Sequence, residues 1–210
     1  MKRVKGIVEV NESGLNARQL RQIRRYFNMW AWGNLYRKKQ MDKLGIKKLG
    51  SGANGEVFEI FGFAVKFFRD GSRDPYILEK LQGHPMFPKL YAYSKGEFMI
   101  VERICGETCD EAYKLNKLNK SNIKRSWKDN VMSCFEFVKE RNILCFDLHP
   151  GNVMLTNNGE FVIIDVGEFE TDYNYRLSEE RRLEDFLYDM KRAILLDKWS
   201  ENEGKDEEVA

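Results

Sequence analysis

The sequence predicts an α+β fold in which antiparallel hairpins and amphipathic helices occupy separate stretches of the chain. Turn signals between apolar runs predict two β-hairpins, one around Phe61-Gly62 and one around Asn158-Gly159. Apolar residues that recur every three or four positions predict long helices within residues 20–30, 123–138 and 183–195. With 210 residues, of which 42% are hydrophobic, the chain can form one domain with a real core or two small lobes that share a cleft.

The N-terminal part of the chain carries a strongly basic stretch. Residues 18–48 contain ten Lys and Arg side chains and one acidic side chain, whereas the formal net charge of the whole chain is only +2. Such a stretch could bind nucleic acid, an acidic partner or a regulator. We favour a helix that begins near Asn16 and packs on the main domain, because its apolar stripe is long enough to need burial. That stripe consists of Leu20, Ile23, Phe27 and Trp30.

Composition also limits the location and the partners. No run approaches the roughly 18 apolar residues of a membrane span, and Met1 is not followed by a long apolar segment, so we expect a cytoplasmic protein without a membrane partner. The four cysteines form no Cys-x-x-Cys pair and the only histidines are His84 and His149, so a structural zinc site is not expected. Residues 201–210 hold five acidic side chains and one Lys, which predicts a disordered tail. We expect a monomer.

Three oxygen-bearing side chains lie near the second hairpin. A two-residue turn at Asn158-Gly159 would place Asn152 directly opposite Asp165, and Asp147 precedes Asn152 by five residues. Carboxylate and amide oxygens suit magnesium, which keeps further positions for phosphate oxygens and water. The alternative is an ordinary polar loop beside a hairpin, since Asp and Asn are common in turns.

A glycine-rich segment lies between two strand-like runs. Gly50, Gly52 and Gly55, together with Ser51, Ala53 and Asn54 between them, could let backbone N–H groups approach a polyphosphate without Cβ obstruction. The context is strand, loop, strand, whereas a dinucleotide-binding fold needs strand, loop, helix.

The strand after this segment contains a lysine. A tight turn at Phe61-Gly62 would pair Val57 with Lys66 and place Ala64 on the same face. That face fits an adenine packed on Val57 and Ala64, with Lys66 reaching the phosphates. The alternative is an exposed lysine on a two-faced strand, and the register with Val57 argues against it.

Together these motifs resemble the ordered signature set of the protein-kinase-like superfamily. The set comprises Gly50-x-Gly52-x-x-Gly55-x-Val57, Ala64-Val65-Lys66, Asp147-x-x-x-x-Asn152 and Asp165-Val166-Gly167. The resemblance implies a bilobal protein-kinase-like fold with an antiparallel-sheet N-lobe at 46–104 and a minimal helical C-lobe at 105–200. Residues 1–45 would be a basic helical extension and residues 201–210 an acidic tail.

The resemblance also implies roles for individual residues, with ATP and Mg²⁺ as cofactors. Lys66 would orient the α- and β-phosphates and pair with Asp74 or, failing that, Glu79. Asp165 would bind the principal magnesium and Asn152 a second one, while Asp147 would accept the proton of the attacking hydroxyl beside His149. The adenine would be enclosed by Val57, Ala64, Val101 and Met154 and would meet the backbones of Glu102 and Ile104.

Departures from the usual pattern shape the functional hypotheses. Cys145-Phe146 replaces the usual His-Arg before the catalytic Asp, so we expect constitutive or partner-driven activity. Asp147-x-His149-x-x-Asn152 resembles RIO-type kinases and small-molecule phosphotransferases. The short stretch after Asp165 lacks an Ala-Pro-Glu motif, so a full peptide-docking subdomain is not expected.

The leading hypothesis is a compact, bacterial, RIO-like serine/threonine protein kinase that acts on a protein substrate. The complete glycine-rich segment favours it over the second hypothesis, a small-molecule phosphotransferase of the aminoglycoside or choline kinase type. The third hypothesis is a nucleotide-binding pseudokinase or accessory subunit. Nucleic-acid binding through residues 18–48 is an alternative that we do not favour.

Overall fold

The computed structural model describes residues 4–31, 41, 43–119, 121–171 and 178–198. The chain forms two compact units. The first comprises Met1–Pro75 and Lys89–Arg103, and the second comprises Tyr76–Pro88 and Ile104–Ala210. This division differs from the ranges expected from the sequence, because the N-terminal helix shares a unit with the strands and residues 76–88 join the second unit. The acidic tail 201–210 and the basic residues Arg37, Lys38 and Lys39 lie outside the described residues.

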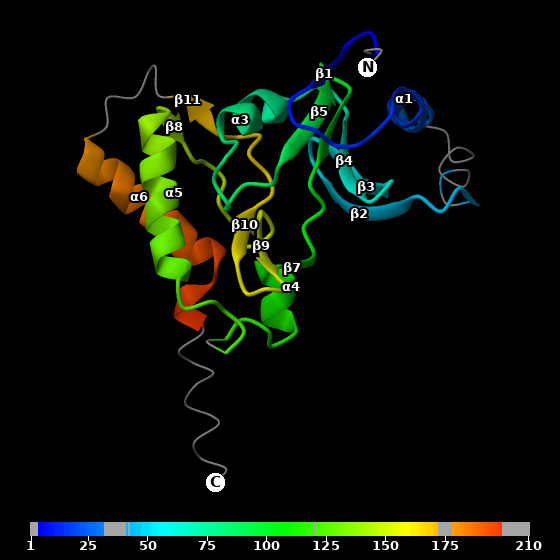
Figure 1. Cartoon of the computed structure of the whole chain (residues 1–210). Helices are drawn as coiled ribbons and strands as arrows, with labels where there is room; N and C mark the ends of the chain where they lie inside the picture. Colours follow the sequence, from blue (N-terminus) through cyan, green and yellow to red (C-terminus); the bar gives the residue numbers. More distant parts are fainter. Residues whose placement is uncertain (1–3, 32–40, 42, 120, 172–177, 199–210) are drawn as a thin grey trace. The chain divides into compact units, whose positions relative to one another are not determined.

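The first unit contains a six-stranded antiparallel sheet (Figure 1). Its strand order is β1-β5-β6-β4-β3-β2. The strands are β1 (Ile7–Glu9), β2 (Lys47–Gly52), β3 (Gly55–Ile60), β4 (Phe63–Phe68), β5 (Leu90–Ser94) and β6 (Phe98–Val101). Phe61 and Gly62 both have positive φ between β3 and β4, and the strands pair Val57 with Lys66. This two-residue turn and its register are as predicted.

Helix α1 (Ala17–Ala31) packs against this sheet. A capping box starts it: Asn16 Oδ1 accepts a hydrogen bond from Gln19 N at 3.0 Å, and Gln19 Oε1 accepts one from Asn16 N at 2.9 Å. Its buried side chains include Leu20 and Ile23, and Phe27 meets Phe67 of β4 edge-on with ring centroids 5.7 Å apart. Phe27 and Trp30 are partly buried against the same core, so the predicted packing of the apolar stripe is confirmed.

Strand alternation gives the sheet two different faces. Phe58, Val65 and Phe67 belong to the core cluster that also contains the buried α1 residues. The cross-strand pairs Val57–Lys66 and Ala64–Val101 lie between these positions and so belong to the opposite face. The expected placement of Val57, Ala64 and Lys66 on one face is therefore present within this unit, and Val101 lies on the same face.

The second unit is mainly helical, with two small sheets. Its helices are α4 (Cys109–Lys114), α5 (Trp127–Glu140) and α6 (Glu179–Ala193), together with α3 (Asp74–Lys80), whose first two residues belong to the first unit. Its sheets are β10-β9-β7 and β11-β8, with β7 (Gly106–Thr108), β8 (Ile143–Leu144), β9 (Val153–Thr156), β10 (Phe161–Ile163) and β11 (Glu170–Thr171).

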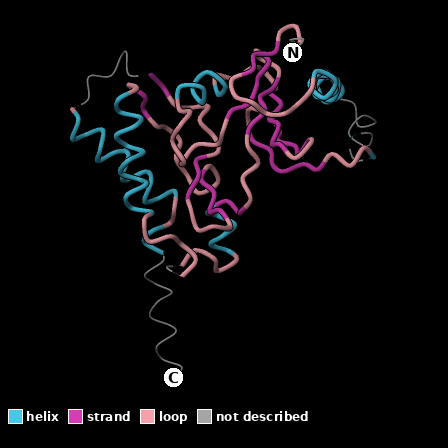
Figure 2. The backbone as a smooth tube through the Cα atoms, viewed as in Figure 1, coloured by secondary structure: helices cyan, strands magenta, loops and turns pink. Residues whose placement is uncertain are grey.

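Helices α5 and α6 lie side by side, and both appear in cyan in Figure 2. Phe135 of α5 and Phe186 of α6 are in contact, with ring centroids 5.6 Å apart. Thr108 forms a capping box with Glu111 at the start of α4, and the Ser178 side chain caps α6.

The hairpin between β9 and β10 differs from its prediction by one residue. β9 and β10 pair Val153 with Ile163, so the loop comprises three residues, 157–159, instead of two. Gly159 N donates to Thr156 O at 2.9 Å, and only Gly159 in this loop has a positive φ, of 75°. These features are those of a type I turn followed by a left-handed glycine. A Cβ on Gly159 would lie 2.4 Å from the Asn122 carbonyl oxygen, so the packing also requires glycine there.

The register shift overturns one expectation about the site. Asn152 lies beside Ile164, whose N donates to Asn152 O at 2.9 Å, so Asn152 is not directly opposite Asp165. A shift of one residue also moves a side chain to the other face of a strand pair. The fold is nevertheless of the predicted mixed α+β class. Across the described helices, none combines the length and the apolar composition that a bilayer crossing requires.

Candidate active site

Lys66 and Asp74 form a buried ion pair. Lys66 Nζ lies 2.5 Å from Asp74 Oδ2, and the side chains are 8% and 0% exposed. Ser72 holds the carboxylate in place, since Ser72 Oγ donates to Asp74 Oδ1 at 2.7 Å and accepts from Asp74 N at 3.1 Å. The sequence left Asp74 and Glu79 as candidate partners, and the structure pairs Lys66 with Asp74. A buried ammonium on an apolar strand needs such a partner.

The glycine-rich segment forms the hairpin between β2 and β3, with Gly52 paired to Gly55 and a tip at Ala53-Asn54. Its glycines are required for different reasons. A Cβ on Gly55 would lie 2.0 Å from the Phe67 carbonyl oxygen, so β4 excludes any side chain there. At Gly50 and Gly52 no described atom lies within 4 Å of an added Cβ, and neither φ is positive. The fold therefore does not explain these two glycines, whereas close approach of a phosphate would.

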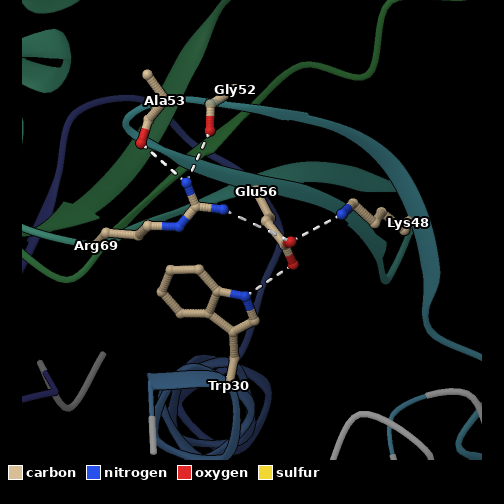
Figure 3. A network of polar contacts seen from close by, with 6 residues as sticks. All are labelled: Trp30, Lys48, Gly52, Ala53, Glu56 and Arg69. Atoms are coloured by element: carbon tan, nitrogen blue, oxygen red, sulfur yellow. Dashed lines mark hydrogen bonds and ion pairs between the residues drawn. The ribbon is translucent and has the colours of Figure 1, made fainter. Parts of the chain in front are cut away.

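Figure 3 shows a polar network at the tip of this hairpin that the sequence analysis missed. Arg69 Nη1 donates to Gly52 O at 3.0 Å and to Ala53 O at 2.9 Å. Glu56 Oε2 accepts from Trp30 Nε1 of α1 at 2.8 Å. The sequence could have indicated that Arg69 lies at this tip. The Val57–Lys66 register, continued by three residues, places Arg69 opposite Asn54.

The residues expected around an adenine are divided between the two units. In the first unit, Val57, Ala64 and Val101 share one face of the sheet. Glu102 N donates to Lys89 O at 2.8 Å, so only the Glu102 carbonyl remains to meet an adenine amino group. Ile104 and Met154 belong to the second unit.

The loop from Asp147 to Asn152 is held by its own hydrogen bonds. Asp147 has a left-handed backbone, with φ of 58°, a conformation that Asp and Asn adopt more readily than most residues. Asn152 Nδ2 donates to Asp147 O at 3.0 Å and to Asp147 Oδ2 at 3.3 Å. The Asp147 side chain is 55% exposed, so its carboxylate is fixed in direction yet accessible.

His149 belongs to the same loop. Its Nδ1 accepts from Gly151 N at 3.1 Å, which assigns the proton of the neutral ring to Nε2, 3.8 Å from Asp147 Oδ2. A Cβ on Gly151 would come within 2.9 Å of the imidazole, so glycine is needed for this approach. Sequence reasoning had assigned no role to Gly151.

Asp165 and Asn152 supply oxygen atoms in the second unit. Asp165 Oδ1 accepts from Gly167 N at 3.1 Å, which orients the carboxylate. The next residue, Val166, is buried at the position where the kinase pattern usually has Phe. Because the Asn152 amide nitrogen is engaged by Asp147, the Asn152 oxygen is the end that can face a cation.

The ABC1 atypical kinase-like domain matches residues 78–189, which is more than half of the chain. The chain belongs to the ABC1 atypical kinase-like family. The region of this ABC1 domain contains the Asp147–Asn152 loop and Asp165, and it begins after Lys66 and the glycine-rich hairpin.

Two curated proteins resemble this ABC1-family chain. Serine/threonine-protein kinase C of Synechocystis sp. is 32% identical over 100 residues, which are 45% of this chain and 19% of that protein. Serine/threonine-protein kinase PEPKR2 of Arabidopsis thaliana is 27% identical over 113 residues, which are 50% of this chain and 24% of that protein. The matches thus span about a fifth to a quarter of these relatives. The family and the relatives support kinase-like phosphotransfer.

Proposed function

We propose that this protein transfers the γ-phosphoryl group of ATP, with magnesium, to a Ser or Thr hydroxyl of a protein substrate. The observation that carries the proposal is the buried Lys66–Asp74 ion pair, on the same sheet face as Val57 and Ala64 and on the strand next to the glycine-rich hairpin. The bilobal kinase arrangement and the likeness to RIO-type protein kinases belong to the same proposal, as do the monomeric state and the cytoplasmic location.

The residues of the first unit fit a nucleoside triphosphate. Lys66 supplies a positive charge whose direction is fixed by Asp74 and Ser72. Gly50 and Gly52 leave backbone without side chains at positions where the fold alone would accept alanine. These features favour binding of phosphate groups by an ammonium and by backbone amides.

The residues of the second unit fit magnesium. Among the described residues, no three His, Cys, Asp or Glu side chains gather as a metal site, so protein ligation would rest on Asp165 and the amide oxygen of Asn152. Magnesium commonly binds through one or two protein oxygens together with phosphate oxygens and water. When bound, it would neutralise charge on the phosphates during transfer.

Asp147 would receive the proton of the attacking hydroxyl. Its carboxylate is accessible and is oriented by Asn152, while Nε2 of His149 lies 3.8 Å from the same oxygen. Phosphoryl transfer depends mainly on positioning and charge neutralisation, so an oriented carboxylate is an adequate base.

The test is incubation with γ-labelled ATP and magnesium, alone and with a generic basic protein. We expect label on Ser or Thr of the protein, none with Asp165→Ala, and unchanged labelling with the control Asp129→Ala, an exposed carboxylate on α5. Absence of labelling by a wild-type protein that binds ATP would instead favour the pseudokinase or accessory-subunit hypothesis.

His149 favours one alternative, a small-molecule phosphotransferase. The Asp147-x-His149 spacing resembles that class, and His149 contacts the loop that would hold the base. Label that appears only on added small alcohols or amino sugars, and never on protein, would support this alternative. Nucleic-acid binding remains disfavoured, because the apolar stripe of α1 is used in packing on the sheet.

A further inference from the structure

Helix α1 is connected to the glycine-rich hairpin by a side-chain hydrogen bond. Trp30 lies in the last turn of α1 and stacks at a tilt on Phe67, with ring centroids 5.6 Å apart. From there its indole Nε1 donates to Glu56 Oε2 at 2.8 Å. Glu56 is the second residue of β3 and directly follows Gly55, so the helix contacts the hairpin close to its tip.

Glu56 contacts strand β2, helix α1 and Arg69, which directly follows β4 (Figure 3). Its Oε1 lies 2.7 Å from Lys48 Nζ of β2 and 3.9 Å from Arg69 Nη2, while its Oε2 accepts from Trp30. The Glu56 side chain is only 17% exposed, which places these contacts in partly desolvated surroundings where charged hydrogen bonds are stronger. Lys48 and Trp30 therefore fix the carboxylate beside Arg69.

Arg69 in turn donates hydrogen bonds to all the carbonyl groups at the hairpin tip. Its Nη1 donates to Gly52 O and Ala53 O, and its backbone N donates to Asn54 O at 3.1 Å. In a trans peptide the C=O and N–H of one unit point in opposite directions, and the described chain has no cis peptide. Because the carbonyls face Arg69, the amides of Ala53 and Asn54 face away from it. Within the described residues, neither of these two N–H groups donates a hydrogen bond.

We propose that Trp30, Glu56 and Arg69 are positioning residues that hold the Ala53 and Asn54 amides ready for the terminal phosphates of ATP. Two adjacent amides that point the same way form an anion-binding concavity, and Arg69 fixes their direction without contacting the phosphates. Helix α1 thereby becomes part of the nucleotide-binding apparatus through Trp30. This inference rests on the proposed function, since it presupposes ATP as the ligand.

The test compares binding of Mg·ATP, AMP and adenosine by titration calorimetry, together with the KM for ATP and kcat. Arg69→Met, Glu56→Gln and Trp30→Phe remove one contact each, and Trp30→Phe keeps an aromatic ring on Phe67. The control is Arg24→Met, because Arg24 also caps a carbonyl, of Lys5, and pairs with a glutamate, Glu97, elsewhere in the same unit.

We expect each of the three variants to weaken Mg·ATP binding about tenfold, which corresponds to one interaction of about 1.4 kcal/mol. Binding of adenosine and AMP should change less than twofold, and the KM for ATP should rise more than kcat falls. Arg69→Lys should recover part of the affinity, since an ammonium can still donate to a carbonyl. The double variant Trp30→Phe/Arg69→Met should weaken binding little more than Arg69→Met alone, because both act through one chain of contacts.

Two results would overturn the inference while leaving the proposed function intact. One is wild-type affinity for Mg·ATP in all three variants, and the other is equal weakening of ATP and adenosine, which would indicate general damage to the sheet. If the wild-type protein binds no Mg·ATP, the proposed function fails first and the inference fails with it.

Discussion

The Nζ atom of Lys66 and the Oδ2 atom of Asp74 lie 2.5 Å apart, and neither side chain has more than a trace of solvent exposure. Such a pair contributes little net stability, because desolvation of both charges offsets most of their attraction. Removal of one partner is strongly destabilising, because the other charge then stays in the interior without the opposite charge of this pair. The pair is therefore better explained by the direction it gives the ammonium than by stabilisation of the fold.

The variant Asp74→Asn should lower the free energy of unfolding by about 3–5 kcal/mol, because Lys66 keeps its charge without the Asp74 carboxylate. The double variant Lys66→Met/Asp74→Asn should recover at least half of this loss, because the buried charge is then absent as well. Urea unfolding of Asp74→Asn, Lys66→Met and the double variant measures the coupling. Strictly additive losses would show that the two residues do not act as a pair.

Gly52 and Gly55 should respond differently to alanine. Gly55→Ala forces a methyl group to within 2.0 Å of the Phe67 carbonyl oxygen and should cost about 3 kcal/mol or more of stability. Gly52→Ala meets no described atom within 4 Å and should unfold within about 0.5 kcal/mol of wild type. Its effect should appear in ATP affinity instead. Unfolding curves and nucleotide titrations separate the two, and a strongly unstable Gly52→Ala would contradict the assignment.

Asp147→Asn should preserve the conformation of the loop but remove the carboxylate that acts as the base in the proposed reaction. Asparagine tolerates the left-handed backbone that Asp147 adopts, with φ of 58°, so stability should change by less than about 0.5 kcal/mol. The rate of phosphoryl transfer should fall about 10²- to 10⁴-fold, while the nucleotide dissociation constant stays within twofold. Single-turnover kinetics and titration measure the two quantities. Asp147→Val is a useful contrast, because a β-branched residue strains this backbone and should lower stability as well.

The stability of the protein should fall below about pH 6.5 because of His84. Burial and the nearby Arg141 charge lower the pKa of His84 from its usual value of 6.5. The hydrogen bonds of the ring favour its neutral form, since Nδ1 accepts from Met86 N at 3.2 Å and Nε2 lies 3.0 Å from Ser133 Oγ. The unfolded chain therefore binds the proton more readily, so the His84 contribution is complete above pH 6.5 and is lost as the pH falls towards the lowered pKa.

The check for His84 is urea unfolding between pH 5.0 and 7.5. His84→Gln should flatten the pH dependence of the unfolding free energy in that window. A wild-type slope in His84→Gln would assign the effect to other groups.

The parts of the structure that sequence reasoning predicted well depend on strong local signals. Phe61-Gly62 gave the two-residue turn and the Val57–Lys66 register, because a turn with positive φ at both central positions fixes the pairing of its strands. Asn16 and Gln19 likewise fixed the start of α1, since their mutual hydrogen bonds involve only neighbouring residues.

The second hairpin shows where local signals are insufficient. Asn158-Gly159 fits a two-residue turn and also the last two positions of a three-residue turn, and the packing of Gly159 against the Asn122 backbone accompanies the second form. Long-range contacts of this kind are not visible in the sequence around the turn. The choice of Asp74 over Glu79 and the role of Arg69 likewise depend on which side chains the fold brings together.

The loop at 157–159 packs closely against the backbone near Asn122, and this packing limits where the chain can be modified. Extra residues inserted there would collide with the backbone near Asn122, so a reporter peptide or a circular-permutation break at this point should prevent folding. The turn at Phe61-Gly62 has more open space, because an added Cβ on Gly62 meets no described atom within 4 Å, but its positive φ of 82° still favours glycine there. A fluorescent label attached at Phe61, which is 41% exposed, would report on the β3–β4 hairpin without altering its packed side.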